Sequence, residues 1–186
     1  QMCIRDRFRE ISDDEVRNFD NIRQGLDWGY ATDPLAMIRL HYDKTRRCIY
    51  LFDEIYQVKM SNREASQAVL NKKLNDVRII ADSAEPKSID EVKQYGVKII
   101  GANKAPGSVE FGEKWLDDLE AIVIDPKRCP NAAKEFENID YQVDRNGNTK
   151  NRLEDKDNHL IDATRYALSE DMVERKLKSI SKDLLF

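Results

Sequence analysis

The order of the expected strands and helices is the feature that most constrains the fold of this chain. Residues 23–29, 34–42 and 47–55 read as three strands separated by short turns, which predicts an antiparallel meander. From residue 61 onward, helix and strand patterns alternate. This order predicts one domain of the α/β class, with a mixed central sheet flanked by helices. The expected helices cover residues 61–74, 86–94, 108–119, 130–137 and 158–177, and the strands between them cover residues 77–81, 97–100 and 121–124.

Two segments lie outside this alternation. Residues 139–153 carry the pair Asn146-Gly147 between polar flanks, which is a strong signal for an added β-hairpin. Residues 1–22 are expected to form a linker or N-terminal tail, with at most a short helix at residues 13–19. We expect the domain itself at residues 23–177 and a C-terminal tail at residues 178–186.

Composition limits the classes of function. The 31 basic and 35 acidic residues give a net charge of −4, whereas nucleic-acid binders usually have a basic surplus. Any contact with DNA would therefore use a local basic patch or bound cations. No apolar run approaches the roughly 20 residues that cross a bilayer, so we expect no membrane protein. The glycine loop at residues 101–108 has the wrong spacing for a phosphate loop, so no ATPase motif is expected.

Two aspartates follow apolar strands. Asp27 lies in the segment 25–29 (GLDWG), and Asp82 comes directly after the apolar strand at residues 77–81. Ligands bind at the carboxyl ends of strands in open α/β sheets. Each aspartate also has a structural interpretation. Asp27 would bind its own backbone in a turn, and Asp82 or Ser83 would cap the next helix.

A third acidic position lies at the start of the last expected helix. His159 and Asp162 are three residues apart, so they share one face of this helix. Asp162 falls between Ile161 and Ala163 on the side expected to face the core, where an unpaired carboxylate is costly. Asp157 is instead well placed to cap the amino terminus of the helix.

These three carboxylates form a donor set suited to a hard divalent cation. Carboxylate oxygens favour Mg²⁺ or Mn²⁺, which keep positions for water and phosphate oxygens. Two such ions roughly 4 Å apart support hydrolysis of a phosphodiester bond. The sequence therefore predicts two Mg²⁺ or Mn²⁺ ions held by Asp27, Asp82 and Asp162.

Between about residues 21 and 171 the chain resembles the nuclease domain of phage terminase large subunits, a family with an RNase H-like fold. The resemblance implies an RNase H-like nuclease domain at residues 23–177, with Asp27, Asp82 and Asp162 as the three metal-binding carboxylates and His159 beside the metals. The matching segments are 25–30 (GLDWGY) with 33–34 (DP), 81–88 (ADSAEPKS) and 157–166 (DNHLIDATRY).

The resemblance also implies roles for residues around this acidic site. The hairpin at residues 139–153 would be the nuclease-specific hairpin, with three cations that guide the DNA backbone, although polar hairpin residues are usually only solvated. Four further acids are secondary candidates for the site. The hairpin cations are Arg145, Lys150 and Arg152, and the secondary acids are Asp33, Glu54, Glu85 and Asp157.

The function implied is a metal-dependent endonuclease that cuts concatemeric double-stranded DNA by a two-metal mechanism during viral packaging. Its implied partners are a packaging ATPase domain, the small terminase subunit and the portal, in the cytoplasm of an infected bacterial host. Two alternatives remain open. One is another RNase H-like nuclease of the resolvase, transposase or integrase type, and the other is a docking module that binds DNA or the portal without cleavage.

Overall fold

The computed structural model describes residues 7–143, 147, 149–154 and 156–172. The strands of its main sheet are β1 (Arg7–Phe8), β2 (Ile22–Asp27), β3 (Pro34–Asp43), β4 (Cys48–Val58), β5 (Ile79–Ala81), β6 (Ile99–Gly101) and β7 (Ala121–Ile124). The helices are α1 (Asp13–Arg17), α2 (Asn62–Asn71), α3 (Pro86–Gln94), α4 (Ser108–Asp117), α5 (Pro130–Asn138) and α6 (His159–Ala167).

The sheet is mixed, with the strand order β1-β7-β4-β3-β2-β5-β6. Strands β2, β3 and β4 pair antiparallel and form the expected meander. Strands β5 and β6 extend the sheet in parallel beside β2, and β7 and β1 extend it in parallel beside β4. The predicted α/β class and mixed sheet are therefore confirmed.

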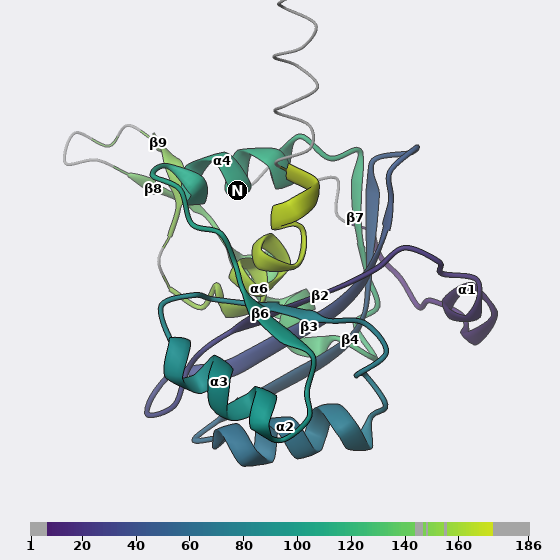
Figure 1. Cartoon of the computed structure of the whole chain (residues 1–186). Coiled ribbons are helices and arrows are strands. Elements are labelled where there is room, and N and C mark those ends of the chain that lie inside the picture. Colours follow the sequence, from purple (N-terminus) through teal and green to yellow (C-terminus); the bar gives the residue numbers. More distant parts are fainter. Residues whose placement is uncertain (1–6, 144–146, 148, 155, 173–186) are drawn as a thin grey trace, which may run out of the picture.

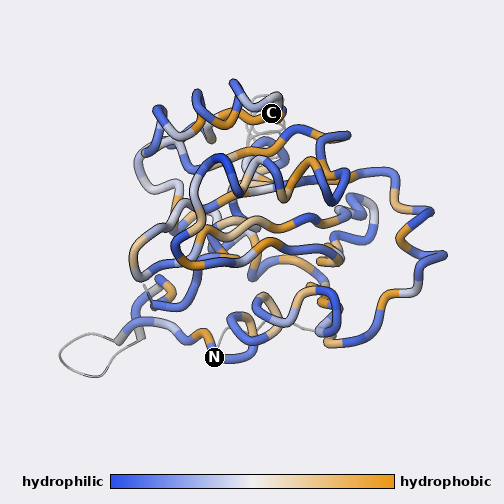
Figure 2. Tube along the Cα trace, turned by 90° about the horizontal axis from the view of Figure 1, so that it is seen from below, coloured by the Kyte–Doolittle hydropathy of each residue, from blue (hydrophilic) through white to orange (hydrophobic). Residues whose placement is uncertain are grey.

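Helices cover both faces of this sheet, with α2 and α3 on one side and α4 and α6 on the other (Figure 1). The alternation of side chains along β3 explains the two layers, because successive strand residues point to opposite faces. Leu35 and Met37 pack in the core beneath α2 and α3. Ala36 and Ile38 pack in the core shared by α4, α5 and α6. Figure 2 shows many of the hydrophobic residues in the middle of the molecule and mostly hydrophilic residues toward its outside.

The start of α2 follows the signal in the sequence. Ser61 is the N-cap, and its hydroxyl accepts a hydrogen bond from the Glu64 backbone N–H. The Glu64 carboxylate in turn accepts from the Ser61 backbone N–H at 2.8 Å. This reciprocal pair satisfies two N–H groups that the first turn leaves free, which fixes where the helix begins.

The expected hairpin is present as a separate two-stranded sheet. Strands β8 (Tyr141–Val143) and β9 (Thr149–Leu153) pair antiparallel. Leu153 anchors the hairpin, because its side chain is 2% exposed within the core beside α6. Its backbone N–H also donates to Glu113 Oε2 at 3.0 Å, which ties β9 to α4.

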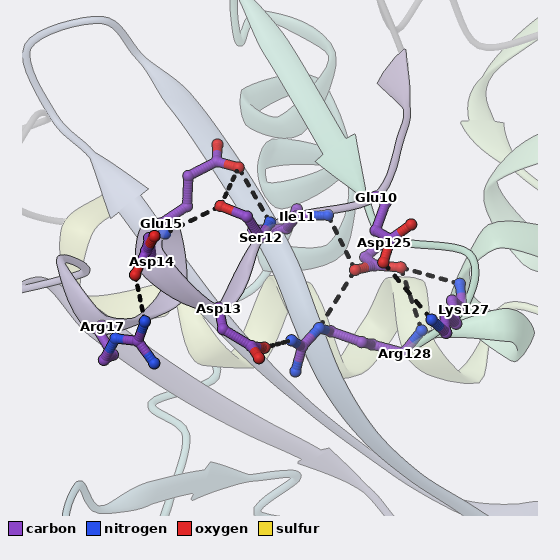
Figure 3. Close-up of polar contacts among 10 residues, drawn as sticks. All are labelled: Glu10, Ile11, Ser12, Asp13, Asp14, Glu15, Arg17, Asp125, Lys127 and Arg128. Atoms are coloured by element: carbon purple, nitrogen blue, oxygen red, sulfur yellow. Dashed lines mark hydrogen bonds and ion pairs between the residues drawn. The ribbon is translucent and has the colours of Figure 1, made fainter.

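The amino-terminal segment contains more structure than the short helix expected there. Strand β1 pairs with β7 and forms an edge of the main sheet, and α1 follows with Ser12 as its N-cap. The fully buried Asp125 holds this segment (Figure 3), because it accepts a hydrogen bond from the Ile11 backbone N–H at 3.0 Å. Asp125 also accepts from the Lys127 and Arg128 backbone N–H groups, at 2.9 and 3.2 Å. Residues 7–22 are therefore packed against the domain.

The last expected helix is interrupted. Helix α6 ends at Ala167 with Leu168 as its C-cap, and helical residues resume at 169–172. The remainder of the expected helix, residues 173–177, lies outside the described residues, as does the tail at 178–186. In the part of the chain that the structure describes, no helix combines the length and the apolar character that a membrane span requires.

Candidate metal centre

The register of two neighbouring strands brings Asp27 and Asp82 to the same edge of the sheet. Strands β2 and β5 run parallel with Leu26 opposite Ala81, so each aspartate directly follows a matched position. The Asp82 backbone N–H donates to Leu26 O at 2.9 Å and continues the pairing by one residue. The Trp28 indole N–H donates to Asp82 O at 2.9 Å, which further fixes the backbone at this position.

The structural interpretations of these two aspartates are not what the structure shows. Asp82 Oδ1 accepts a hydrogen bond from the Ala84 backbone N–H at 2.8 Å, but the N-cap of α3 is Glu85. Asp82 therefore orders the turn that follows β5 without capping the helix. The hydrogen bond described for the Asp27 carboxylate is to His159, and not to its own turn.

Helix α6 reaches this edge because Gly25 lets it approach β2 closely. A Cβ atom at Gly25 would lie 1.8 Å from Ala163 O and 2.6 Å from Ala167 N, well inside any tolerated contact. A glycine inside a strand often marks such a close backbone approach. The approach brings the first turn of α6, with His159 and Asp162, beside the carboxyl end of β2.

His159 contacts Asp27 directly. His159 Nδ1 lies 3.1 Å from Asp27 Oδ2, and the two side chains are 19% and 14% exposed. This hydrogen bond with Asp27 raises the pKa of His159. Burial raises the pKa of Asp27, the His159 bond opposes that rise, and the negative charges of Asp162 and Asp82 add to it. Three carboxylates therefore influence one another electrostatically at this edge.

The other two carboxylates each pair with a cation. Lys104 forms an ion pair with Asp82 Oδ1, and Arg165 Nη2 lies 3.0 Å from Asp162 Oδ1. Burial favours a higher pKa for Asp82, but the bonds from Lys104 and the Ala84 N–H outweigh it and leave this pKa below its ordinary value. Arg165 is fixed in place, because it is buried and its stem lies where a Cβ on Gly112 of α4 would be.

Two glutamates from distant strands and helices orient the elements of the site. Glu135 on α5 accepts hydrogen bonds from the Leu160 and Ile161 backbone N–H groups, at 2.7 and 3.2 Å, and so caps α6 from outside the helix. Burial raises the pKa of Glu135 to about 7. Glu54 on β4 caps α5 in the same way, through the Asn131 and Ala132 N–H groups, each at 3.0 Å.

This arrangement corrects one expectation about α6. Asp157 is not its N-cap. That position is Asn158, which makes no side-chain capping bond, while Asp157 is exposed with a φ of 50°. Glu135 supplies the acceptor that the sequence pattern assigned to Asp157. Glu54, a secondary candidate, has its carboxylate bonded to the start of α5.

The other candidates lie around the site. Asp33 is exposed in the turn before β3 and contributes negative charge at His159. Glu85 is exposed and lines a separate cavity with Trp28 and Ser61. Of the hairpin cations, Lys150 and Arg152 are exposed on β9. The remaining one, Arg145, lies outside the described residues.

The carboxylates of Asp27, Asp82 and Asp162 are the type of ligand that a hard divalent cation prefers. Among the residues described, no three His, Cys, Asp or Glu side chains converge closely enough to hold a metal ion as they stand. Asp82 and Asp162 are instead ion-paired with Lys104 and Arg165, two cations of the chain itself. Burial is the main cause of the raised pKa of Asp27, and the negative charges of Asp162 and Asp82 add to it, so a bound cation would stabilise the ionised form of this carboxyl.

Several residues of the site were not identified from the sequence. Lys104 and Glu135 reach Asp82 and the start of α6 only through the tertiary fold. Arg165 and Tyr166 follow Asp162 by three and four residues on α6, so helical spacing alone could have indicated that they lie beside it. Gly25 was also not identified, although the sequence does carry a signal for it. A glycine within an apolar strand often marks a position where another backbone segment approaches closely. The neighbouring Trp28, also within the GLDWG segment, gave no such signal.

Comparison with known proteins extends these observations. The family model described as "Terminase RNAseH like domain" matches residues 27–170. The chain is 59% identical to the large terminase subunit of Bacillus phage SPP1 over 164 residues, which is 87% of this chain and 39% of that protein. It is 34% identical over 151 residues to the PBSX phage terminase large subunit of Bacillus subtilis strain 168, covering 80% of this chain and 34% of that protein.

A solved structure shows a similar fold. The nuclease domain of the SPP1 large terminase, crystallised with bound Mn, superposes with a TM-score of 0.87 and 57% sequence identity, covering 89% of this chain and 96% of that one. The chain thus spans 39% and 34% of the two curated relatives, and nearly all of this nuclease domain. With its fold, its acidic edge and a family match over most of its length, the chain belongs to the terminase RNase H-like domain family.

Proposed function

We propose that this domain is the metal-dependent endonuclease of a phage terminase large subunit, hydrolysing phosphodiester bonds of double-stranded DNA. The observation that carries the proposal is the placement of Asp27 and Asp82 at matched ends of adjacent parallel strands, with Asp162 and His159 presented by the first turn of α6. The relative from phage SPP1 supports it, because that structure is a terminase nuclease domain with bound Mn.

In this proposal Asp27, Asp82 and Asp162 hold two Mg²⁺ or Mn²⁺ ions, and His159 is an auxiliary ligand or orients the attacking water. Such ions, when bound, supply activation of a water and stabilisation of the leaving oxygen. The chain supplies rigid placement. Asp27 and Asp82 are fixed by sheet pairing, and Asp162 is fixed by a helix that is anchored against Gly25.

His159 is suited to proton transfer at this edge. Ionised Asp27 accepts a hydrogen bond from His159 Nδ1, which favours the tautomer protonated at that nitrogen. His159 Nε2 is then the atom able to take up a proton. The bond with Asp27 raises the pKa of His159, so this imidazole holds a proton more readily than an unperturbed histidine does.

We propose concatemeric viral DNA as the substrate, and a packaging ATPase domain, a small terminase subunit and the portal as partners in the infected bacterial host. The whole relatives are described as terminase large subunits, of which this domain corresponds to about two fifths or less. The exposed Lys150 and Arg152 on the hairpin are the described cations proposed to guide the DNA backbone, together with Arg145.

Cleavage of supercoiled plasmid by the purified chain tests this proposal. Nicking and linearisation are measured with Mn²⁺, with Mg²⁺ and with a chelator, for the wild type, Asp82→Asn and the control Asp90→Asn. Asp90 is an exposed aspartate on α3, so the control makes the same chemical change away from the site. We expect metal-dependent cutting that Asp82→Asn reduces at least about 100-fold, because loss of a group that only supports a metal ligand already costs about 10- to 100-fold and Asp82 is proposed as a ligand itself.

Two results would contradict the proposal. Cutting by Asp82→Asn at the wild-type rate would remove Asp82 from the site. No cutting with either metal, combined with no thermal stabilisation by Mn²⁺, would favour the docking module, because a metal that binds only the folded state must raise its melting temperature.

A further inference from the structure

Lys104 lies on the loop at residues 102–107 that connects β6 to α4, and its side chain reaches Asp82. Its ammonium forms an ion pair with Asp82 Oδ1, the same oxygen that accepts the Ala84 N–H. The Lys104 and Asp82 side chains are 38% and 18% exposed, respectively. A cation of the chain therefore occupies a carboxylate that the proposed function assigns to a metal.

Tyr166 places this ammonium on the α6 side of Asp82. Lys104 Nζ lies 5.4 Å from the centre of the Tyr166 ring, within the range of a cation–π contact. Tyr166 is four residues after Asp162, so both side chains lie on one face of α6. The ammonium is thus held between the carboxyl end of β5 and the helix that carries Asp162, where the proposed ions would bind.

Arg165 is the second cation at this site, and its side chain is more buried than that of Lys104. Its side chain is 7% exposed, packs against Gly112 and lies 4.6 Å from the Tyr166 ring centre. Lys104 is more exposed and sits on a loop without helix or strand geometry. A cavity of about 180 Å³ beside Lys104 is lined by this loop, by the start of α4 and by α6. Because Lys104 is the more exposed of the two cations and lies on a loop, we expect it to leave its carboxylate more readily than Arg165.

We propose that Lys104 is an internal counter-ion for Asp82 which a divalent cation must displace, so that Lys104 sets the metal affinity of the site. This inference rests on the proposed function, because it takes Asp82 as a metal ligand. An ammonium and a divalent cation on one carboxylate repel each other, so binding of the metal includes breaking the Lys104–Asp82 pair. In the metal-free protein the same pair offsets repulsion among the three aspartates.

Calorimetric titration of the purified chain with Mn²⁺ tests this role, for the wild type, Lys104→Met, Lys104→Arg and Lys98→Met. Lys98 is exposed and precedes the opposite end of β6, so Lys98→Met makes the same charge change away from Asp82. Methionine keeps the length of the lysine stem without its charge. We expect Lys104→Met to tighten Mn²⁺ binding about three- to tenfold, whereas Lys98→Met and Lys104→Arg stay near the wild type.

Melting curves without metal provide a second readout. Without its counter-ion, Lys104→Met should melt at a lower temperature than Lys98→Met in chelator and gain more from saturating Mn²⁺. Unchanged or weaker Mn²⁺ binding by Lys104→Met, with the wild type binding normally, would overturn the counter-ion role and leave the proposed function intact. If neither the wild type nor Lys104→Met binds Mn²⁺, both the counter-ion role of Lys104 and the proposed metal site are wrong.

Discussion

Replacement of Gly25 by alanine tests whether close contact between β2 and α6 builds the site. The new methyl group would lie 1.8 Å from Ala163 O, and reaching an ordinary contact of 3.4 Å requires α6 to move by about 1.6 Å. The obstacle is helix backbone, which cannot rotate away as a side chain can. Overpacking a core costs about 1–3 kcal/mol, so we expect Gly25→Ala to destabilise the fold by about 3 kcal/mol.

The same displacement would carry His159 and Asp162 away from Asp27. Misplacement of catalytic groups by about 1 Å can cost about 100-fold in rate, and we expect a loss of this size in plasmid cleavage. Urea unfolding measures the stability change. The matched control is Gly101→Ala on β6, where the new methyl group would lie 3.1 Å from Ser83 Cβ and 3.3 Å from Ile89 Cδ1, so that a shift of a few tenths of an ångström restores ordinary contact. The control should cost less than about 1 kcal/mol. A Gly25→Ala protein that keeps wild-type stability and cleavage would refute the reasoning.

Three further predictions concern stability and DNA binding. Burial raises the pKa of Glu135 from 4.5 to about 7, and its carboxyl faces Tyr56, Glu54 and His159. Because the folded protein favours the protonated carboxyl, Glu135 contributes stability below pH 4.5 that is lost as the pH rises to about 7. Urea unfolding in chelator should therefore show the wild type losing up to about 3 kcal/mol relative to Glu135→Gln over this window, and parallel pH profiles would contradict the shift. Asp125→Ala leaves the buried Ile11 N–H and the part-buried Lys127 and Arg128 N–H groups without their acceptor, so it should destabilise the chain by about 3 kcal/mol in the same assay. A cost below about 1 kcal/mol would show that Asp125 is not the anchor of this segment. Lys150→Ser with Arg152→Ser should weaken DNA binding in titrations at several salt concentrations and lower the salt slope by up to about 2, without changing the melting temperature; an unchanged slope would remove the hairpin from the DNA path.

The sequence predicted the layers of the fold because its signals there are local. The Ser61–Glu64 pair marked the start of α2. The apolar strand expected at residues 77–81 is present as β5, which ends at the predicted residue Ala81. The acidic residues at the sheet edge could be predicted for the same reason. An aspartate that directly follows an apolar strand is visible in the local sequence pattern alone. The position of Asp27 and Asp82 at this edge was predicted in this way, and their role as metal ligands stays a prediction.

The remaining features depend on contacts between distant segments. The cap of α6 comes from Glu135, more than twenty residues earlier, so the local rule pointed to Asp157 instead. The counter-ion of Asp82 comes from a loop whose glycines first suggest a phosphate loop. Strand β1 was not expected, because two residues that pair with a distant strand carry no periodicity of their own.

Anomalous diffraction from crystals grown with Mn²⁺ measures the central claim most directly. The account predicts two anomalous peaks at the carboxyl ends of β2 and β5, bordered by Asp27, Asp82 and Asp162, with Lys104 turned away from Asp82. It also predicts that Asp82→Asn loses at least one of the peaks. No Mn²⁺ at this edge, or Mn²⁺ bound only elsewhere in the chain, would contradict the assignment of these carboxylates as the metal centre.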